Sequence, residues 1–177
     1  MPSVYQKKSF RLIEKEFAMN VETLYPPIMV GTVCRSFEEA IKQGGYSWVN
    51  PDITADKVGQ VCMIRREIHV VPPDPDLWAR EGWQLCRNGV WPLLDLMVLF
   101  ETDPFLKELC GFDIVAAEPE NPASIFGGHS GAPSHICVRQ CDGSPEFKRR
   151  LDFTHVRKGW KGWDSRWRVL VEKIPKQ

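Results

Sequence analysis

Side chains that could do chemistry concentrate in residues 127–141. This segment carries two of the four histidines, two of the six cysteines and a serine between glycines. The residues concerned are His129, Ser130, His135, Cys137 and Cys141. Imidazole, thiolate and hydroxyl groups act as zinc ligands, general bases and nucleophiles. We therefore consider nucleophilic catalysis and metal binding for this segment.

Residues 128–133, Gly-His-Ser-Gly-Ala-Pro, resemble the Gly-x-Ser-Gly-x-Pro nucleophile motif of chymotrypsin-like serine proteases. The resemblance implies that Ser130 is a nucleophile, but His129 stands where that family usually has Asp. The sole upstream histidine is His69, in an unrelated Glu-Ile-His-Val setting, and capped helices predicted between residues 75 and 111 do not fit a double β-barrel. A triad is defined by geometry. We keep only the hypothesis of a small hydrolase or transferase that uses Ser130 as nucleophile or His155 as general acid or base.

Strand geometry restricts the metal hypothesis. If residues 135–141 are extended, Cys137 and Cys141 lie about 13 Å apart, at roughly 3.3 Å per residue. Both thiolates could not then bind one zinc ion or form a disulfide. We predict no cofactor and keep zinc, with His135 and Cys137 as ligands, only as an alternative.

Alternate residues of a strand project from one face, so His135, Cys137 and Arg139 should lie together. A symmetric hairpin to residues 151–157 would pair Cys137 with His155 and Arg139 with Phe153, which adds His155 to that face. The predicted binding residues are His129, Ser130, His135, Cys137, Arg139 and His155. Leu151 and Phe153 would share the same face, so hydrogen-bonded core packing is the alternative for its histidines.

The segment before this strand, residues 118–134, contains three prolines and three glycines and shows no regular pattern. Loops of that length are uncommon in compact domains and are usually functional or mobile. We expect a pocket, bounded by loop 118–134 and the His135/Cys137/His155 face, that binds a small molecule or a partner.

The elements around this segment follow from local signals. Ser36 and Glu39 form a capping box in which Glu39 should accept from the Ser36 amide, and Gly44 should end the helix. A strand within residues 61–71 should place His69 on its polar face. A helix capped by Asp74 should continue to about residue 89. Further helices are expected after Trp91 and after Asp103, followed by a buried strand at residues 112–117.

Three alternating runs close the chain, at residues 135–141, 151–157 and 166–174. They predict an antiparallel three-stranded meander. Strands at both ends with helices between them favour an α+β fold over an alternating α/β fold. We predict one domain, residues 1–177, with a mixed or antiparallel sheet and helices packed on one face.

Composition excludes some classes of protein. Of the 177 residues, 43% are hydrophobic and 26% are charged, which are globular values. No apolar run approaches the ~20 residues of a membrane span, and no secretory signal is recognisable, so we expect a cytoplasmic protein with buried free cysteines. Residues 148–177 carry 10 basic and 3 acidic residues, together with Trp160, Trp163 and Trp167. We nevertheless predict no nucleic-acid binding, because the overall charge is zero and no recognised motif is present.

Seven tryptophans support another class of protein, an interaction module that forms a homodimer or larger homo-oligomer through a tryptophan-rich surface. Light scattering on the purified protein separates this class from a monomeric ligand-binding domain.

Overall fold

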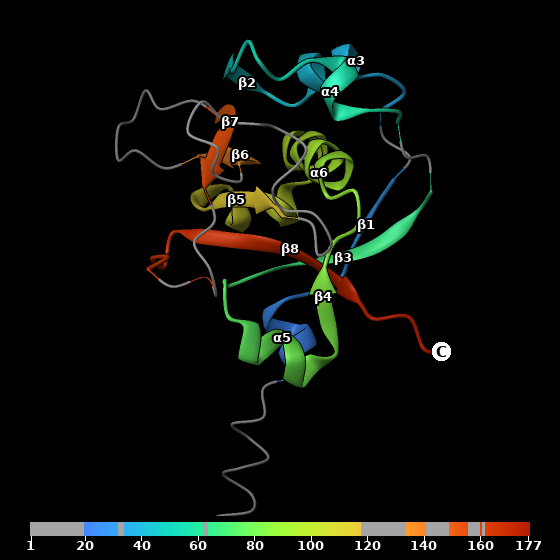
Figure 1. Ribbon diagram of the computed structural model, residues 1–177, viewed down its shortest axis with the longest axis vertical. Helices are drawn as coiled ribbons and strands as arrows, with labels where there is room; N and C mark the ends of the chain where they lie inside the picture. Colours follow the sequence, from blue (N-terminus) through green and yellow to red (C-terminus); the bar gives the residue numbers. More distant parts are fainter. Residues whose placement is uncertain are drawn as a thin grey trace, which may run out of the picture.

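The protein is an α+β fold in which a mixed sheet lies between helices (Figure 1). The computed structural model describes residues 20–31, 34–61, 64–117, 134–140, 149–155, 160 and 162–177. The α+β class and the mixed sheet agree with the prediction from sequence. In the described parts of the chain, none of the helices has the length and apolar character needed to cross a bilayer.

Eight strands form one sheet in the order β1-β3-β8-β5-β6-β7-β2, with β4 also paired to β8. Their bounds are β1 Ile28–Val30, β2 Tyr46–Val49, β3 Arg66–Val71, β4 Trp83–Leu85, β5 Asp113–Ala116, β6 Ser134–Arg139, β7 Arg149–His155 and β8 Trp167–Lys173. The β8–β5 and β7–β2 pairs are parallel and the others antiparallel.

Strand β8 is the centre of this sheet. It pairs with β3 on one side and with both β4 and β5 on the other, since Val171 is opposite both His69 and Leu85. Val169, Leu170 and Val171 are all fully buried. A strand buried on both faces needs neighbours and cover on both sides. This corrects the predicted meander, because β6 and β7 form the expected hairpin but β8 does not pair with β7.

The helical segments agree with most of the capping signals. Their bounds are α2 Val21–Leu24, α3 Phe37–Gln43, α4 Ala55–Val58, α5 Pro75–Glu81, α6 Val90–Thr102 and the 3-10 helix η1 Pro104–Gly111. Ser36 caps α3 by accepting from the Glu39 amide at 3.1 Å. The Glu39 carboxylate accepts from the Arg35 amide, one residue earlier than predicted.

Helix α5 is shorter than predicted. Asp74 accepts from the amides of Asp76 and Leu77, and Gly82 ends the helix in the left-handed conformation. The chain then forms the short strand β4, where a continuing helix was predicted. Glycine adopts positive φ without a Cβ clash, so it can end a helix and also redirect the chain.

The first face of the sheet packs on α6, ten of whose thirteen residues are buried. Helix α3 lies against α6 on this side, as Figure 1 shows. Buried side chains from both layers form this larger core, among them Leu93, Leu94, Met97, Ile114, Ile136, Val138, Leu151 and Leu170. Helix α6 therefore packs on the sheet, as the sequence predicted for the helices.

The second face carries a smaller apolar core covered by α5 and by residues near α2. In Figure 1 these short helices lie on the opposite side of β8 from α6, so helices are present on both faces. His69 lies on this side and is fully buried, where the sequence predicted a surface histidine. Its ring stacks on Trp83 at 4.8 Å, and its Nδ1 lies 2.8 Å from the carbonyl oxygen of Tyr25. Contacts remote in sequence thus override the local alternation.

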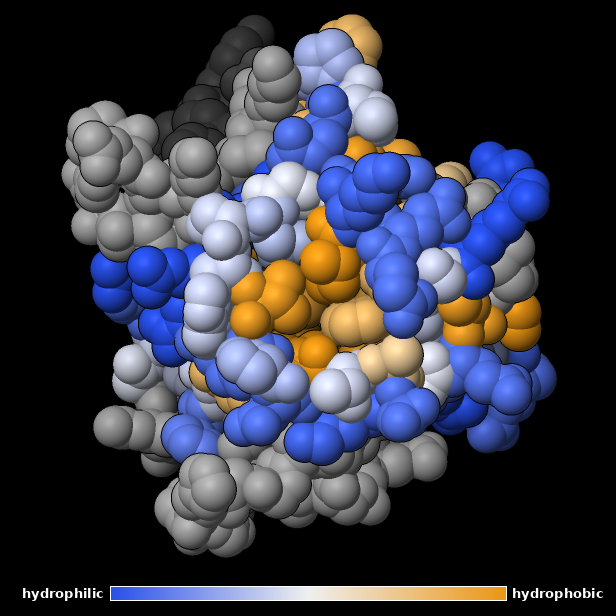
Figure 2. Space-filling model, turned by 90° about the horizontal axis from the view of Figure 1, so that it is seen from above, coloured by the Kyte–Doolittle hydropathy of each residue, from blue (hydrophilic) through white to orange (hydrophobic). Residues whose placement is uncertain are grey.

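Figure 2 looks down on the end of the molecule that carries α3, α4 and β2. Apolar side chains lie there in a depression that hydrophilic residues surround. Apolar side chains of these elements are partly buried and pack against the larger core, namely Phe37, Ile41, Val49 and Val58. At this end the core reaches the surface.

Arg149 connects helix α3, helix α6 and the sheet on its first face. Its side chain is 8% exposed and forms an ion pair with Glu101 at 2.7 Å. The guanidinium also donates to oxygens of Gly44, Met97 and Gln140. These partners belong to the end of α3, to α6 and to the end of β6. The one charge therefore ties both helices to the β6–β7 hairpin.

Replacing Arg149 by Met is expected to lower the free energy of unfolding by about 2 kcal/mol or more, because buried acceptors lose their donor. Urea denaturation measures the change. Arg80→Met is the matched control, since its ion pair with Glu81 is surface-exposed and should contribute within about 0.5 kcal/mol. Equal effects of the two changes would contradict the role assigned to Arg149.

Candidate functional site

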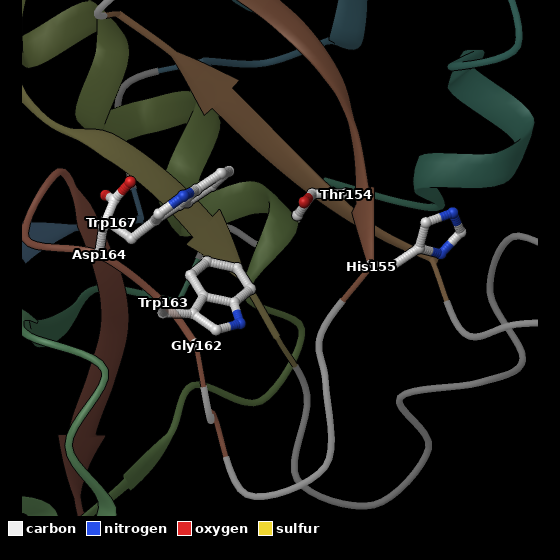
Figure 3. A pocket seen from close by; sticks show the side chains of 6 residues that line it. All are labelled: Thr154, His155, Gly162, Trp163, Asp164 and Trp167. Carbon is white, nitrogen blue, oxygen red and sulfur yellow. The ribbon is translucent and has the colours of Figure 1, made fainter.

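A hollow on the second face of the sheet is lined by Thr154, His155, Gly162, Trp163, Asp164 and Trp167 (Figure 3). We call these six residues the tryptophan pocket. Its volume is about 200 Å³. Thr154 and His155 come from the end of β7, whereas the other four residues belong to the segment that leads into β8. Two strands that are not neighbours in the sheet thus form opposite sides of the pocket.

Four tryptophans in contact build one wall. The ring centroids of Trp163 and Trp167 are 4.4 Å apart with an angle of 67° between the planes. Trp160 is 5.2 Å from Trp163 and 5.3 Å from Trp78. Trp78 is a buried residue of α5, and its indole N–H donates to the carbonyl of Pro72 at 2.9 Å. Helix α5 therefore anchors a row of indoles that ends at the pocket.

The backbone of Trp160 is in an unusual conformation, with φ of +60°. A bulky side chain rarely adopts positive φ, because its Cβ crowds the backbone. Its ring lies between those of Trp78 and Trp163, and these contacts stabilise the conformation. Strained residues of this kind cluster at functional sites, where surrounding packing maintains them.

Asp164 is an oriented acceptor at the rim. Its carboxylate accepts from the Arg166 guanidinium at 2.9 Å and from the Arg166 amide at 2.9 Å. These hydrogen bonds hold the pKa of Asp164 below its usual value. The side chain is therefore charged at neutral pH and fixed in direction.

The register of the β6–β7 hairpin differs from the predicted one. Cys137 is opposite Asp152 and Ser134 is opposite His155, a shift of three residues. An odd shift moves side chains to the other face of the sheet. Leu151 and Phe153 accordingly pack with α6 in the larger core. His155 does not share a face with His135 and Cys137 as predicted, although it does line the pocket from the end of β7.

His135 and Thr154 are directly opposite each other, so their side chains are neighbours on the second face. His135 is 5% exposed, and its Nε2 atom has no hydrogen-bond partner among the described residues. Burial and the nearby His155 lower the pKa of His135 to about 4. The imidazole is therefore neutral at neutral pH and lies beside the pocket wall.

Cys137 and Arg139 occupy the same strand face as His135. Cys137 is fully buried in the smaller core, and burial raises its pKa to about 12. It is therefore a thiol at neutral pH, which is a poor nucleophile and metal ligand. The guanidinium of Arg139 lies over the Trp167 ring, 5.5 Å from its centroid. Arg139 thus supports the tryptophan wall from outside the pocket.

Two predicted site residues, His129 and Ser130, lie outside the described residues, as do residues 118–133 of the predicted loop 118–134, which include the serine motif. Among the residues that the structure does describe, no group of three or more His, Cys, Asp or Glu side chains is placed to hold a metal ion. The described cysteines Cys34, Cys86 and Cys137 are buried and free.

The chain matches no family model, and neither a curated protein nor a solved structure is significantly similar to it.

The sequence pattern did not indicate that four of the lining residues belong to one site, namely Thr154, Trp163, Asp164 and Trp167. The tryptophans at 160, 163 and 167 were interpreted as aromatic residues in a basic stretch and as members of a tryptophan-rich interaction surface. Their density was the available signal. The sequence does not reveal the contact of Trp160 with Trp78, which lies 82 residues earlier in the chain.

The buried His135 predicts a pH dependence of stability. Because its folded pKa is about 4 against an ordinary value of 6.5, the unfolded state binds the proton more tightly. The stabilisation is complete above pH 6.5 and is lost as the pH falls toward 4, by about 3 kcal/mol. His135→Leu should lose correspondingly less stability over this range in denaturant titrations. His155→Gln, which leaves His135 in place, should retain most of the loss. Identical pH profiles for the wild type and His135→Leu would contradict this assignment.

Proposed function

We propose that the protein binds a small ring-shaped molecule in the tryptophan pocket. One observation carries the proposal: two indoles meet at an angle of 67° beside hydrogen-bonding groups on Thr154 and Asp164. Ligand sites typically combine an apolar or aromatic wall with a few oriented polar groups. Indole rings supply large contact areas at a low cost in conformational entropy.

The size of the pocket limits the ligand. Its volume of about 200 Å³ is below the roughly 300 Å³ at which sites for drug-sized molecules begin. A compound of one or two rings is therefore the expected size. We retain the predicted binding function, but the pocket that we propose for it is bounded by the end of β7 and by residues 162–167.

The alternative of a small hydrolase or transferase keeps one supporting observation. His155 lines the pocket, where an imidazole could act as general acid or base toward a bound molecule. Ser130, the nucleophile of that hypothesis, lies outside the described residues. The binding proposal requires no such partner, and we therefore place it first.

The homo-oligomer hypothesis depends on tryptophans at the surface. All seven tryptophans are described, and Trp48, on β2, is the exposed one, at 41%. Trp78, Trp83 and Trp91 are buried, and the others are partly buried against the smaller core. The structure thus offers the tryptophan pocket more support than a tryptophan-rich contact surface.

Fragment screening by ligand-observed NMR tests the proposal, with fragments that range from planar heteroaromatic compounds to saturated ring alcohols. We expect at least one hit whose affinity falls about tenfold or more in Trp163→Leu, because the ligand loses its main contact surface. Trp48→Leu is the matched control and should bind like the wild type.

Thr154→Val, which preserves side-chain volume, provides a second variant if Trp163→Leu is poorly folded. A set of hits with the same affinity for the wild type and for both pocket variants would refute binding in the tryptophan pocket.

A further inference from the structure

The arginines that the structure describes near the tryptophan pocket already have partners. Arg166 is bound to Asp164, and Arg139 lies over the ring of Trp167. Arg168 donates to the carbonyls of Ser165 and Trp167 at 2.9 and 2.8 Å. The six lining residues include no lysine or arginine. Among the described residues, the lining therefore offers no lysine or arginine to a phosphate or carboxylate group on a ligand.

The described residues also disfavour a cationic ligand. One π face of Trp167 already receives the Arg139 guanidinium, whose positive charge would repel a second cation nearby. The negative charge of Asp164 is balanced by Arg166 at 2.9 Å. The pocket thus favours a neutral ligand.

The polar groups of the lining suit hydroxyl groups. Each carboxylate oxygen of Asp164 can accept more bonds than the one direction that Arg166 uses, so it can accept from a ligand. The Thr154 hydroxyl can donate and accept, and no hydrogen bond joins it to another described residue. Neighbouring alcohols, which both donate and accept, complement this mixture.

The aromatic groups form a corner, because Trp163 and Trp167 lie 67° apart. A planar base stacks best in a slot between parallel surfaces. A puckered saturated ring can place C–H groups against one indole and still direct its substituents toward a polar rim. Such C–H contacts are individually weak and add through dispersion.

We infer that the ligand of the tryptophan pocket is a neutral sugar ring, with its C–H face on Trp163 and its hydroxyls toward Thr154 and Asp164. This inference rests on the proposed binding function and names the chemical class of its ligand. Binding of a single sugar ring in so open a site is expected to be weak, with Kd of about 1 mM.

The test uses the full chain with methyl glycopyranosides of glucose, galactose, mannose and N-acetylglucosamine. Adenosine and tetramethylammonium serve as the neutral planar and cationic comparisons. Saturation-transfer NMR should show at least one glycoside bound, with transfer strongest at ring C–H protons. Thr154→Val and Asp164→Asn should each weaken binding about fivefold or more, because a hydrogen bond is lost. Asp56→Asn, on α4, is the control and should leave binding unchanged.

The possible outcomes distinguish failure of the sugar inference from failure of the proposed binding function. Binding of adenosine or tetramethylammonium, weakened by Thr154→Val, without any glycoside binding would overturn the sugar inference and leave the proposed pocket standing. Glycoside binding that neither pocket variant weakens would overturn the inference as well. If no compound of this panel and no fragment of the wider screen binds, both the inference and the proposed function fail.

Discussion

The burial of β8 on both faces is the constraint on which the rest of the structure depends. Val169, Leu170 and Val171 are fully buried, so α6 must cover one side of the strand and the tryptophan-rich core the other. The strand also supplies hydrogen-bond partners to β3, β4 and β5, which lie between about 50 and 100 residues earlier in the chain. Closing such long loops costs entropy before the contacts form. The sheet is therefore complete only when the last strand is in place.

The same strand explains why a pocket lies where it does. Trp167 begins β8, and the residues before it cross the second face, where Trp160 and Trp163 join the row that Trp78 starts on α5. The β6–β7 hairpin lies two strands beyond β8, and the end of β7 supplies the opposite, polar side. The packing that buries β8 thus leaves a hollow with one aromatic and one polar side. Structural tryptophans and candidate binding tryptophans belong to one continuous cluster.

Local signals predicted the local structure well. Caps at Ser36 and Asp74 act within a few residues of themselves, and the alternation of residues 167–173 needs only a buried and a less buried face. Features set by remote partners were missed. The register of the hairpin differs from the predicted one by three residues, an odd number, so His155 lies on the opposite face of the sheet from His135 and Cys137. Trp83 stacks on His69, whose strand pattern had suggested an exposed side chain. The pocket was missed for the same reason, because its walls meet only after β7, β8 and α5 have packed.

The most direct test of the account follows the indole N–H signals of the seven tryptophans in a two-dimensional ¹H–¹⁵N spectrum during titration with any fragment or glycoside that binds. Trp163 and Trp167 line the pocket, whereas Trp91 is buried in the core with α6 and Trp48 lies on the edge strand β2. We expect the signals of Trp163 and Trp167 to move first and to saturate together, while those of Trp48 and Trp91 remain in place. Movement of Trp48 or Trp91 with unchanged Trp163 and Trp167 would contradict this expectation.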